Sequence, residues 1–80
     1  MLQDALTIRF YQNLTDNLVE LRHRGYPIDS LRLYIDGYLV ALRQANTLEP
    51  YLINRLEDEV TRYLYDPSNF ATPETLVDYY

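Results

Sequence analysis

Residues 30–45, SLRLYIDGYLVALRQA, carry apolar side chains on two nearly opposite sides of a predicted helix. Successive helical residues are about 100° apart, which groups the side chains as follows. The main apolar side holds Leu31, Ile35, Tyr38, Leu42 and Ala45. The second side holds Leu33, Gly37 and Val40, Tyr34 and Ala41 connect the two sides, and a narrow polar strip holds Arg32, Asp36 and Arg43. A helix that is apolar nearly all round must be buried nearly all round, by its own chain or by another one.

Helical spacing recurs on both sides of this segment and predicts an all-α fold, a three-helix bundle over residues 1–65. The helices are expected at about 2–24, 30–45 and 48–65. The first apolar stripe is Leu6, Phe10, Leu14, Leu18 and Leu21, and the third is Leu52, Ile53, Leu56, Val60, Tyr63 and Leu64. Gly25 is expected to end the first helix. Asp29 is expected as the N-cap of the second, with Ile28 and Leu33 forming a hydrophobic staple.

Residues 66–80 are predicted to form a C-terminal tail, which either starts a short helix at about 73–78 or is a mobile tail without one. Three occupants can cover the second apolar side of the middle helix: the tail, through Phe70, Leu76 and Val77, a second copy of the chain, or a foreign partner. Gly37 sharpens the question, because glycine inside a helix costs about 1 kcal/mol relative to alanine. Either another backbone comes close at Gly37, or the position faces the first helix or the tail.

The composition argues against an enzyme and against several classes of partner. The 80-residue chain has a net charge of −5, seven arginines, no lysine and no cysteine, so nucleic-acid binding, disulfides and thiolate metal sites are not expected. No apolar run is long enough to span a membrane, and the N-terminus does not resemble a secretion signal, so the cytoplasm is the expected location. His23 is the only histidine, and no nucleophile, metal or cofactor site is expected. Asp58 is expected to pair with Arg62.

The leading functional hypothesis is a non-catalytic protein–protein interaction module that presents the middle helix either to a second copy of itself, as a homodimer, or to another protein. Its predicted partner-binding residues are Leu33, Tyr34, Gly37, Val40 and Arg43. The alternative is a sensor for a small or pigment-like molecule, with a pocket between the first two helices lined by Tyr11, Tyr34 and Tyr38. A third hypothesis, a helix-turn-helix DNA reader, is disfavoured by the acidic charge.

Two segments carry a family resemblance: LRLYIDGYL at 31–39 and YLYDPSNF at 63–70. Together with MLQD at 1–4 and DYY at 78–80, they resemble a family of small uncharacterised proteins from cyanobacteria. The resemblance covers nearly the whole chain. It implies an intracellular protein of a photosynthetic cell, and it implies no activity, ligand or partner.

Overall fold

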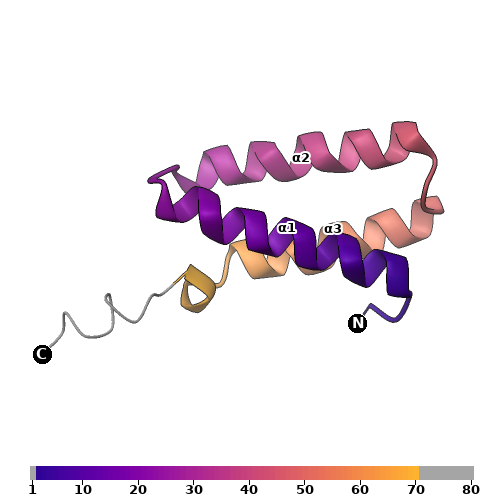
Figure 1. Ribbon diagram of the computed structural model, residues 1–80, viewed down its shortest axis with the longest axis horizontal. Helices are drawn as coiled ribbons and strands as arrows, with labels where there is room; N and C mark the ends of the chain where they lie inside the picture. Colours follow the sequence, from indigo (N-terminus) through magenta and orange to yellow (C-terminus); the bar gives the residue numbers. More distant parts are fainter. Residues whose placement is uncertain (1, 71–80) are drawn as a thin grey trace, which may run out of the picture.

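The computed structural model describes residues 2–70, which form a three-helix bundle (Figure 1). Helix α1 spans Ala5–His23, α2 spans Ile28–Ala45 and α3 spans Pro50–Leu64. A short 3₁₀ helix, η1, follows at Pro67–Phe70. Helix α2 runs antiparallel to α1 and α3, and all three helices pack against one another. The predicted all-α bundle is confirmed for the described part of the chain.

The core lies between the three helices, and its fully buried apolar side chains are all aliphatic. Its buried side chains are Leu14, Leu18, Leu31, Ile35, Leu39, Leu42, Leu48, Ile53, Leu56, Val60 and Leu64. The stripe predicted for α3 is confirmed, because each of its members is buried or half-buried. On α2, Leu39 joins the core although the pattern places it on neither apolar side, and Ala45 is exposed although the pattern places it on the main one.

Four of the five members of the stripe predicted for α1 are buried or half-buried against the core, and the buried face also includes two threonines. Leu6 is 42% exposed, whereas Thr7 and Thr15 are buried. Both hydroxyls find acceptors close by in the chain: Thr7 Oγ1 donates to Asp4 Oδ2 over 2.9 Å, and Thr15 Oγ1 donates to the Gln12 carbonyl over 3.1 Å. A threonine whose hydroxyl is satisfied locally can be buried at little cost, and a search for apolar periodicity overlooks it.

Both ends of α1 are capped by specific local contacts. The helix begins three residues later than predicted, because the Asp4 carboxylate caps it and accepts the Thr7 backbone N–H over 2.9 Å. These hydrogen bonds from Thr7 lower the pKa of Asp4. Gly25, as predicted, ends the helix with a φ of +94°. Its N–H donates to Arg22 O and the Tyr26 N–H donates to Leu21 O, which is the pattern of a Schellman motif.

The predicted start of α2 is wrong. The helix begins at Ile28 with extended Pro27 as its N-cap, so Asp29 lies in the first turn and caps nothing. The carbonyl of Pro27 accepts the N–H groups of Ser30 and Leu31. An acidic residue in the first turn still interacts favourably with the helix dipole. The expected staple between Ile28 and Leu33 is also absent, because Leu33 is 73% exposed.

The remaining connections keep α3 and η1 against the core. Asn46 adopts the left-handed conformation that asparagine tolerates, with φ 58°, and ends α2. The third helix begins at Pro50 rather than near residue 48, and Leu48 in front of it is buried. Phe70 of η1 packs edge-to-face on Tyr63, with 5.8 Å between the ring centroids. Because η1 contacts α1 and α3, Phe70 does not cover the second apolar side of α2. The helix predicted at 73–78, with Leu76 and Val77, lies outside the described residues.

Candidate interaction surface on α2

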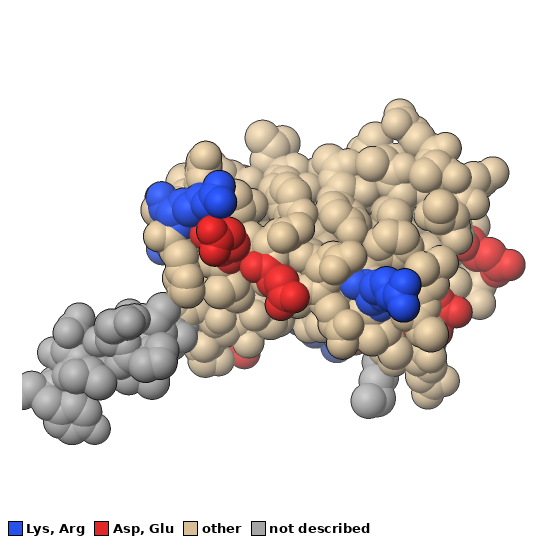
Figure 2. All heavy atoms as spheres, viewed as in Figure 1, with Lys and Arg blue, Asp and Glu red and all other residues tan. Residues whose placement is uncertain are grey.

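The side of α2 that faces away from the core is exposed, uncharged and mostly apolar. We call it the outer face of α2, and its members are Leu33, Gly37, Val40, Ala41 and Gln44. Leu33 is 73% and Val40 49% exposed. None of the five side chains is charged, and Figure 2 shows an expanse without acidic or basic side chains over α2 and its junction with α1. Contiguous apolar surface of this kind, free of charge, is typical of a contact site.

Gly37 has no packing role within the described chain. A Cβ atom at this position would meet no heavy atom within 4 Å, and the residue is exposed. The interpretation of Gly37 as a core position facing the first helix or the tail is therefore wrong for the described residues. The helix bears the conformational cost of a glycine at a position where its own fold leaves room for a side chain.

Tyr34 lies at the border of the outer face and ties α2 to α1. Its phenol oxygen accepts a hydrogen bond from Asn17 Nδ2 over 2.8 Å. Its ring packs on Tyr38 with 6.0 Å between centroids and an interplanar angle of 64°. Asn17, the donor on α1, is itself exposed. Tyr34 is therefore a half-buried, oriented group beside the outer face.

Arg43 is directed to α3 and not to the outer face. Its Nη2 lies 3.5 Å from Glu57 Oε1, and Arg32 Nη2 lies 3.5 Å from the other carboxylate oxygen. Arg32 also pairs with Asp36 over 3.3 Å and donates to Thr61 Oγ1 over 3.1 Å. This charged cluster bridges α2 and α3 along one flank of the outer face. Pairs exposed to this degree contribute about 1 kcal/mol or less each, so the cluster contributes more to orientation than to stability.

The structure does not place the other acids of α3 as predicted. Arg62 Nη1 lies 3.6 Å from Glu59 Oε1, so Arg62 pairs with Glu59 and not with Asp58. Among residues 2–70, no three His, Asp or Glu side chains lie close enough together to hold one metal ion. His23 lies exposed in the last turn of α1, a position where a basic side chain suits the helix dipole.

A shallow apolar groove adjoins the outer face where α1 and α2 meet. It has a volume of about 270 Å³ and is lined by Phe10, Tyr38, Ala41, Leu42, Ala45 and Thr47. We call it the α1–α2 groove. Phe10 and Tyr38 meet edge-to-face across it, with 6.3 Å between centroids. Ala41 belongs to both surfaces, so the groove continues the outer face towards α1. Sequence reasoning missed Phe10, Ala45 and Thr47 here, although two alanines one turn apart on α2 signal a recess.

The three tyrosines predicted to line a ligand pocket do not come together. Tyr34 and Tyr38 pair beside α1, but Tyr11 packs on Tyr63 of α3, with 6.3 Å between centroids. Burial raises the pKa of Tyr11, and the charge of Glu59 raises it further. Burial and the nearby Tyr34 raise the pKa of Tyr38, against a hydrogen bond with Asn13 that lowers it. The phenols of Tyr11 and Tyr38 therefore stay protonated near neutral pH.

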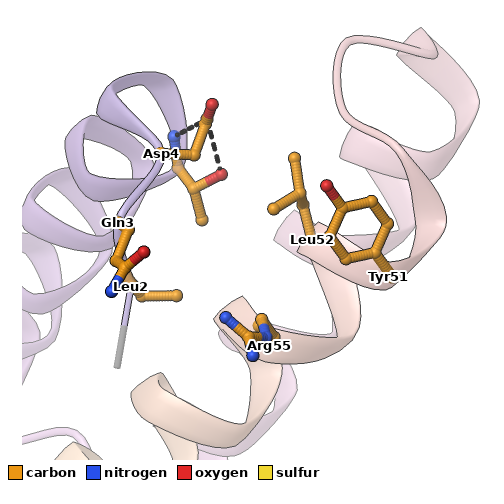
Figure 3. Close-up of a pocket in the computed structure, with 7 residues that line it drawn as sticks. Leu2, Gln3, Asp4, Tyr51, Leu52 and Arg55 are labelled. Carbon is orange, nitrogen blue, oxygen red and sulfur yellow. Dashed lines mark hydrogen bonds between the residues drawn. The ribbon is translucent and has the colours of Figure 1, made fainter.

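A second, more polar pocket lies at the start of α1 (Figure 3). Its volume is about 170 Å³, and it is lined by Leu2, Gln3, Asp4, Thr7, Tyr51, Leu52 and Arg55. The Asp4 carboxylate accepts both the backbone N–H and the hydroxyl of Thr7, as the dashed lines in Figure 3 mark. Asp4 and Thr7 are therefore used in capping α1.

Comparison with known proteins places the chain in a family without assigning it an activity. The model of DUF6761, a family of unknown function, matches residues 1–80. The chain belongs to this family. No curated protein and no solved structure matches the chain. In the described part of the chain, no helix is both long and apolar enough to cross a membrane.

Proposed function

We propose that the chain is a non-catalytic helical interaction module that binds a protein partner through the outer face of α2. The observation that carries the proposal is the exposure of Leu33 and Val40 on a helix side that also holds Gly37 and Ala41 and no charge. Burying a leucine or valine side chain contributes roughly 1.5–3 kcal/mol relative to leaving it in water. A partner that covers this face gains that energy without having to neutralise buried charges.

Two residues named from the sequence have altered roles in this proposal. Tyr34 stays at the margin of the surface, where its hydrogen bond to Asn17 fixes the ring. Arg43 forms a charged rim, because its guanidinium is engaged by Glu57. Rim charges influence association rate and specificity more than affinity. The anchors of the interface are then Leu33 and Val40.

The proposal includes a cellular setting. The family resemblance supports an origin in cyanobacteria, and the sequence supports a cytoplasmic location. The same composition supports a role without catalysis, since a single histidine and two serines supply few members of a nucleophile–base pair. Adaptor, assembly and regulatory roles all fit a small domain whose accessible chemistry is one apolar helix face.

Replacing Val40 with glutamate tests the proposal. We expect association, with itself or with a partner from the native cell, to weaken by about 100-fold or more, because an unpaired carboxylate in an apolar interface costs ~3 kcal/mol or more. Asn54→Glu, on the exposed side of α3, is the matched control for the added charge. Light scattering gives the mass in solution, and circular dichroism shows that both variants stay helical. If Val40→Glu keeps the mass and the partners of the wild type, the outer face is not the binding surface.

The α1–α2 groove supports a second candidate function, the binding of a small apolar or pigment-like molecule. The groove is apolar and concave, but at about 270 Å³ it falls just below the ~300–1,000 Å³ typical of ligand sites. Native mass spectrometry and an absorbance spectrum of freshly purified protein test for a retained ligand. A bound mass that disappears when Ala45→Trp fills the groove supports this function. A wild-type chain at its bare mass, without visible absorbance, excludes it.

A further inference from the structure

The outer face of α2 carries a protrusion and a recess at matched distances from Gly37. Leu33 protrudes, and Ala41 is small and opens onto the α1–α2 groove. At 1.5 Å rise per residue, each lies about 6 Å along the helix from Gly37, in opposite directions. Leu33, Gly37 and Ala41 are four residues apart, so they form one i, i+4 ridge on the helix surface. A two-fold axis beside Gly37 would therefore bring Leu33 of each copy onto Ala41 of the other.

We propose that the occupant of this surface is a second copy of the chain, related by a two-fold axis beside Gly37, with the two α2 helices antiparallel. The inference rests on the proposed function and names its partner. Aligning the two ridges crosses the helices at about 50° from antiparallel, a common helix-packing angle. Leu33 of each copy then enters the α1–α2 groove of the other, between Ala41 and Phe10. Contacts of this kind are isologous, so the pair is closed and does not extend into a filament.

Gly37 supplies the second line of support. At the crossing point the two backbones are at their closest, and a glycine without Cβ lets them approach below the usual 8–10 Å between helix axes. A side chain at this position would have open space around its Cβ, with no atom of its own chain within 4 Å. Close approach within the described bundle therefore does not account for the glycine. A symmetry-related backbone at the same residue does account for it.

Charge and area both bear on the identity of the partner. The chain carries a net charge of −5, so two copies repel each other at long range. The outer face brings no like charges into direct contact, because none of its five side chains is charged. A specific interface buries about 800 Å² per partner, roughly one-seventh of the 5716 Å² surface of the chain. One helix ridge is too narrow to supply this area, so the groove and the adjoining edge of α1 must take part. We therefore expect a weak dimer that depends on concentration.

Cysteine cross-linking tests this arrangement directly, because the natural chain has no cysteine. Under mild oxidation, Gly37→Cys should form a covalent dimer, on the order of ten times more than Asn54→Cys, which reports random collisions. Leu33→Cys alone and Ala41→Cys alone should stay at the control level. In the proposed pair, the two copies of residue 33 lie about 12 Å apart, and so do the two copies of residue 41. A disulfide spans at most roughly 7 Å between Cα atoms. An equimolar mixture of the two should yield the mixed dimer, which mass spectrometry separates from either homodimer.

The outcomes separate this inference from the proposed function. Strong cross-linking of Leu33→Cys or Ala41→Cys alone would place that residue beside its own copy, and would overturn a two-fold axis beside Gly37 with antiparallel helices. If all the cysteine variants cross-link only at the control level, the partner is not a second copy of the chain. If Val40→Glu nevertheless loses binding to another protein, the proposed function still holds. If Val40→Glu also changes nothing, both fail. The mixture of Leu33→Cys and Ala41→Cys chains keeps Gly37 unchanged. The mixed dimer therefore tests the arrangement even if Gly37→Cys alters the helix.

Discussion

Helices α2 and α3 bury their inner sides in the same way and differ in what they leave outside. Each contributes four residues to the aliphatic core: Leu31, Ile35, Leu39 and Leu42 from α2, and Ile53, Leu56, Val60 and Leu64 from α3. The exposed side of α3 holds Asn54, Asp58 and Arg62, with one exposed aromatic, Tyr51, in its first turn, whereas that of α2 holds Leu33, Gly37 and Val40. The bundle explains every apolar residue in the middle of α3. It does not explain the outer face of α2, and that difference is the reason to expect a partner there.

Two leucines within α2 give the largest expected contrast. Leu31 is fully buried and Leu33 is 73% exposed. Leu31→Ala should cost about 2–5 kcal/mol through lost burial and a residual cavity, out of a total of ~4–12 kcal/mol for a chain of this size. Leu33→Ala should change the free energy of unfolding by less than about 0.5 kcal/mol, as surface substitutions do. Urea unfolding at low protein concentration measures both. If both variants lose the same free energy of unfolding, Leu33 is buried even in the dilute chain. That result would contradict the exposed outer face of α2.

The contrast between α2 and α3 also shows what sequence reasoning can reach. Apolar periodicity predicts the stripe of α3, because one polar and one apolar side leave a single way to orient the helix. Placing the residues of α2 around a helical wheel likewise shows that its apolar residues occupy more than the one side that the bundle can bury. The pattern alone does not give the rotation of each helix. It places Leu39 on neither side of α2 and overlooks Thr7 on α1, because burial there depends on which neighbour a side chain meets.

Polar and aromatic details are less predictable, for the same physical reason. Arg43 has no acid at helical spacing, but its partner Glu57 lies on another helix and 14 residues away in the sequence. Tyr11 is predicted to join Tyr34 and Tyr38, but its position on α1 turns it towards α3. The α1–α2 groove is likewise a property of two packed helices. Pairings across helices require the tertiary arrangement, whereas caps and stripes are set by local sequence.

Gly37→Ala gives a smaller effect that sharpens the contrast, because it acts in opposite directions on the monomer and on the pair. Alanine raises helix propensity by about 1 kcal/mol, and its Cβ would meet nothing within 4 Å in the described chain. The monomer should therefore gain up to ~1 kcal/mol in the free energy of unfolding. In the proposed pair two methyl groups would face each other at the crossing point, so self-association should weaken. Urea unfolding and sedimentation over a range of concentrations measure the two effects. If the monomer becomes more stable and self-association is unchanged, the two helices do not cross at Gly37.

The smallest expected effect concerns the sides of α2 and α3 that pack against α1, where the two helices are alike. Tyr38 of α2 and Tyr63 of α3 both pack against α1, and burial raises the pKa of both above the ordinary value of 10.0. The unfolded chain therefore loses these phenolic protons at lower pH than the folded chain does. The stability that this difference contributes is complete below pH 10 and is lost as the pH rises through the raised values. Tyr38→Phe and Tyr63→Phe should each flatten the alkaline fall in the urea midpoint. A flattening seen for Tyr63→Phe alone would mean that the edge of α2 beside the groove opens in solution, and that the two helices differ on their inner edges as well as on their outer ones.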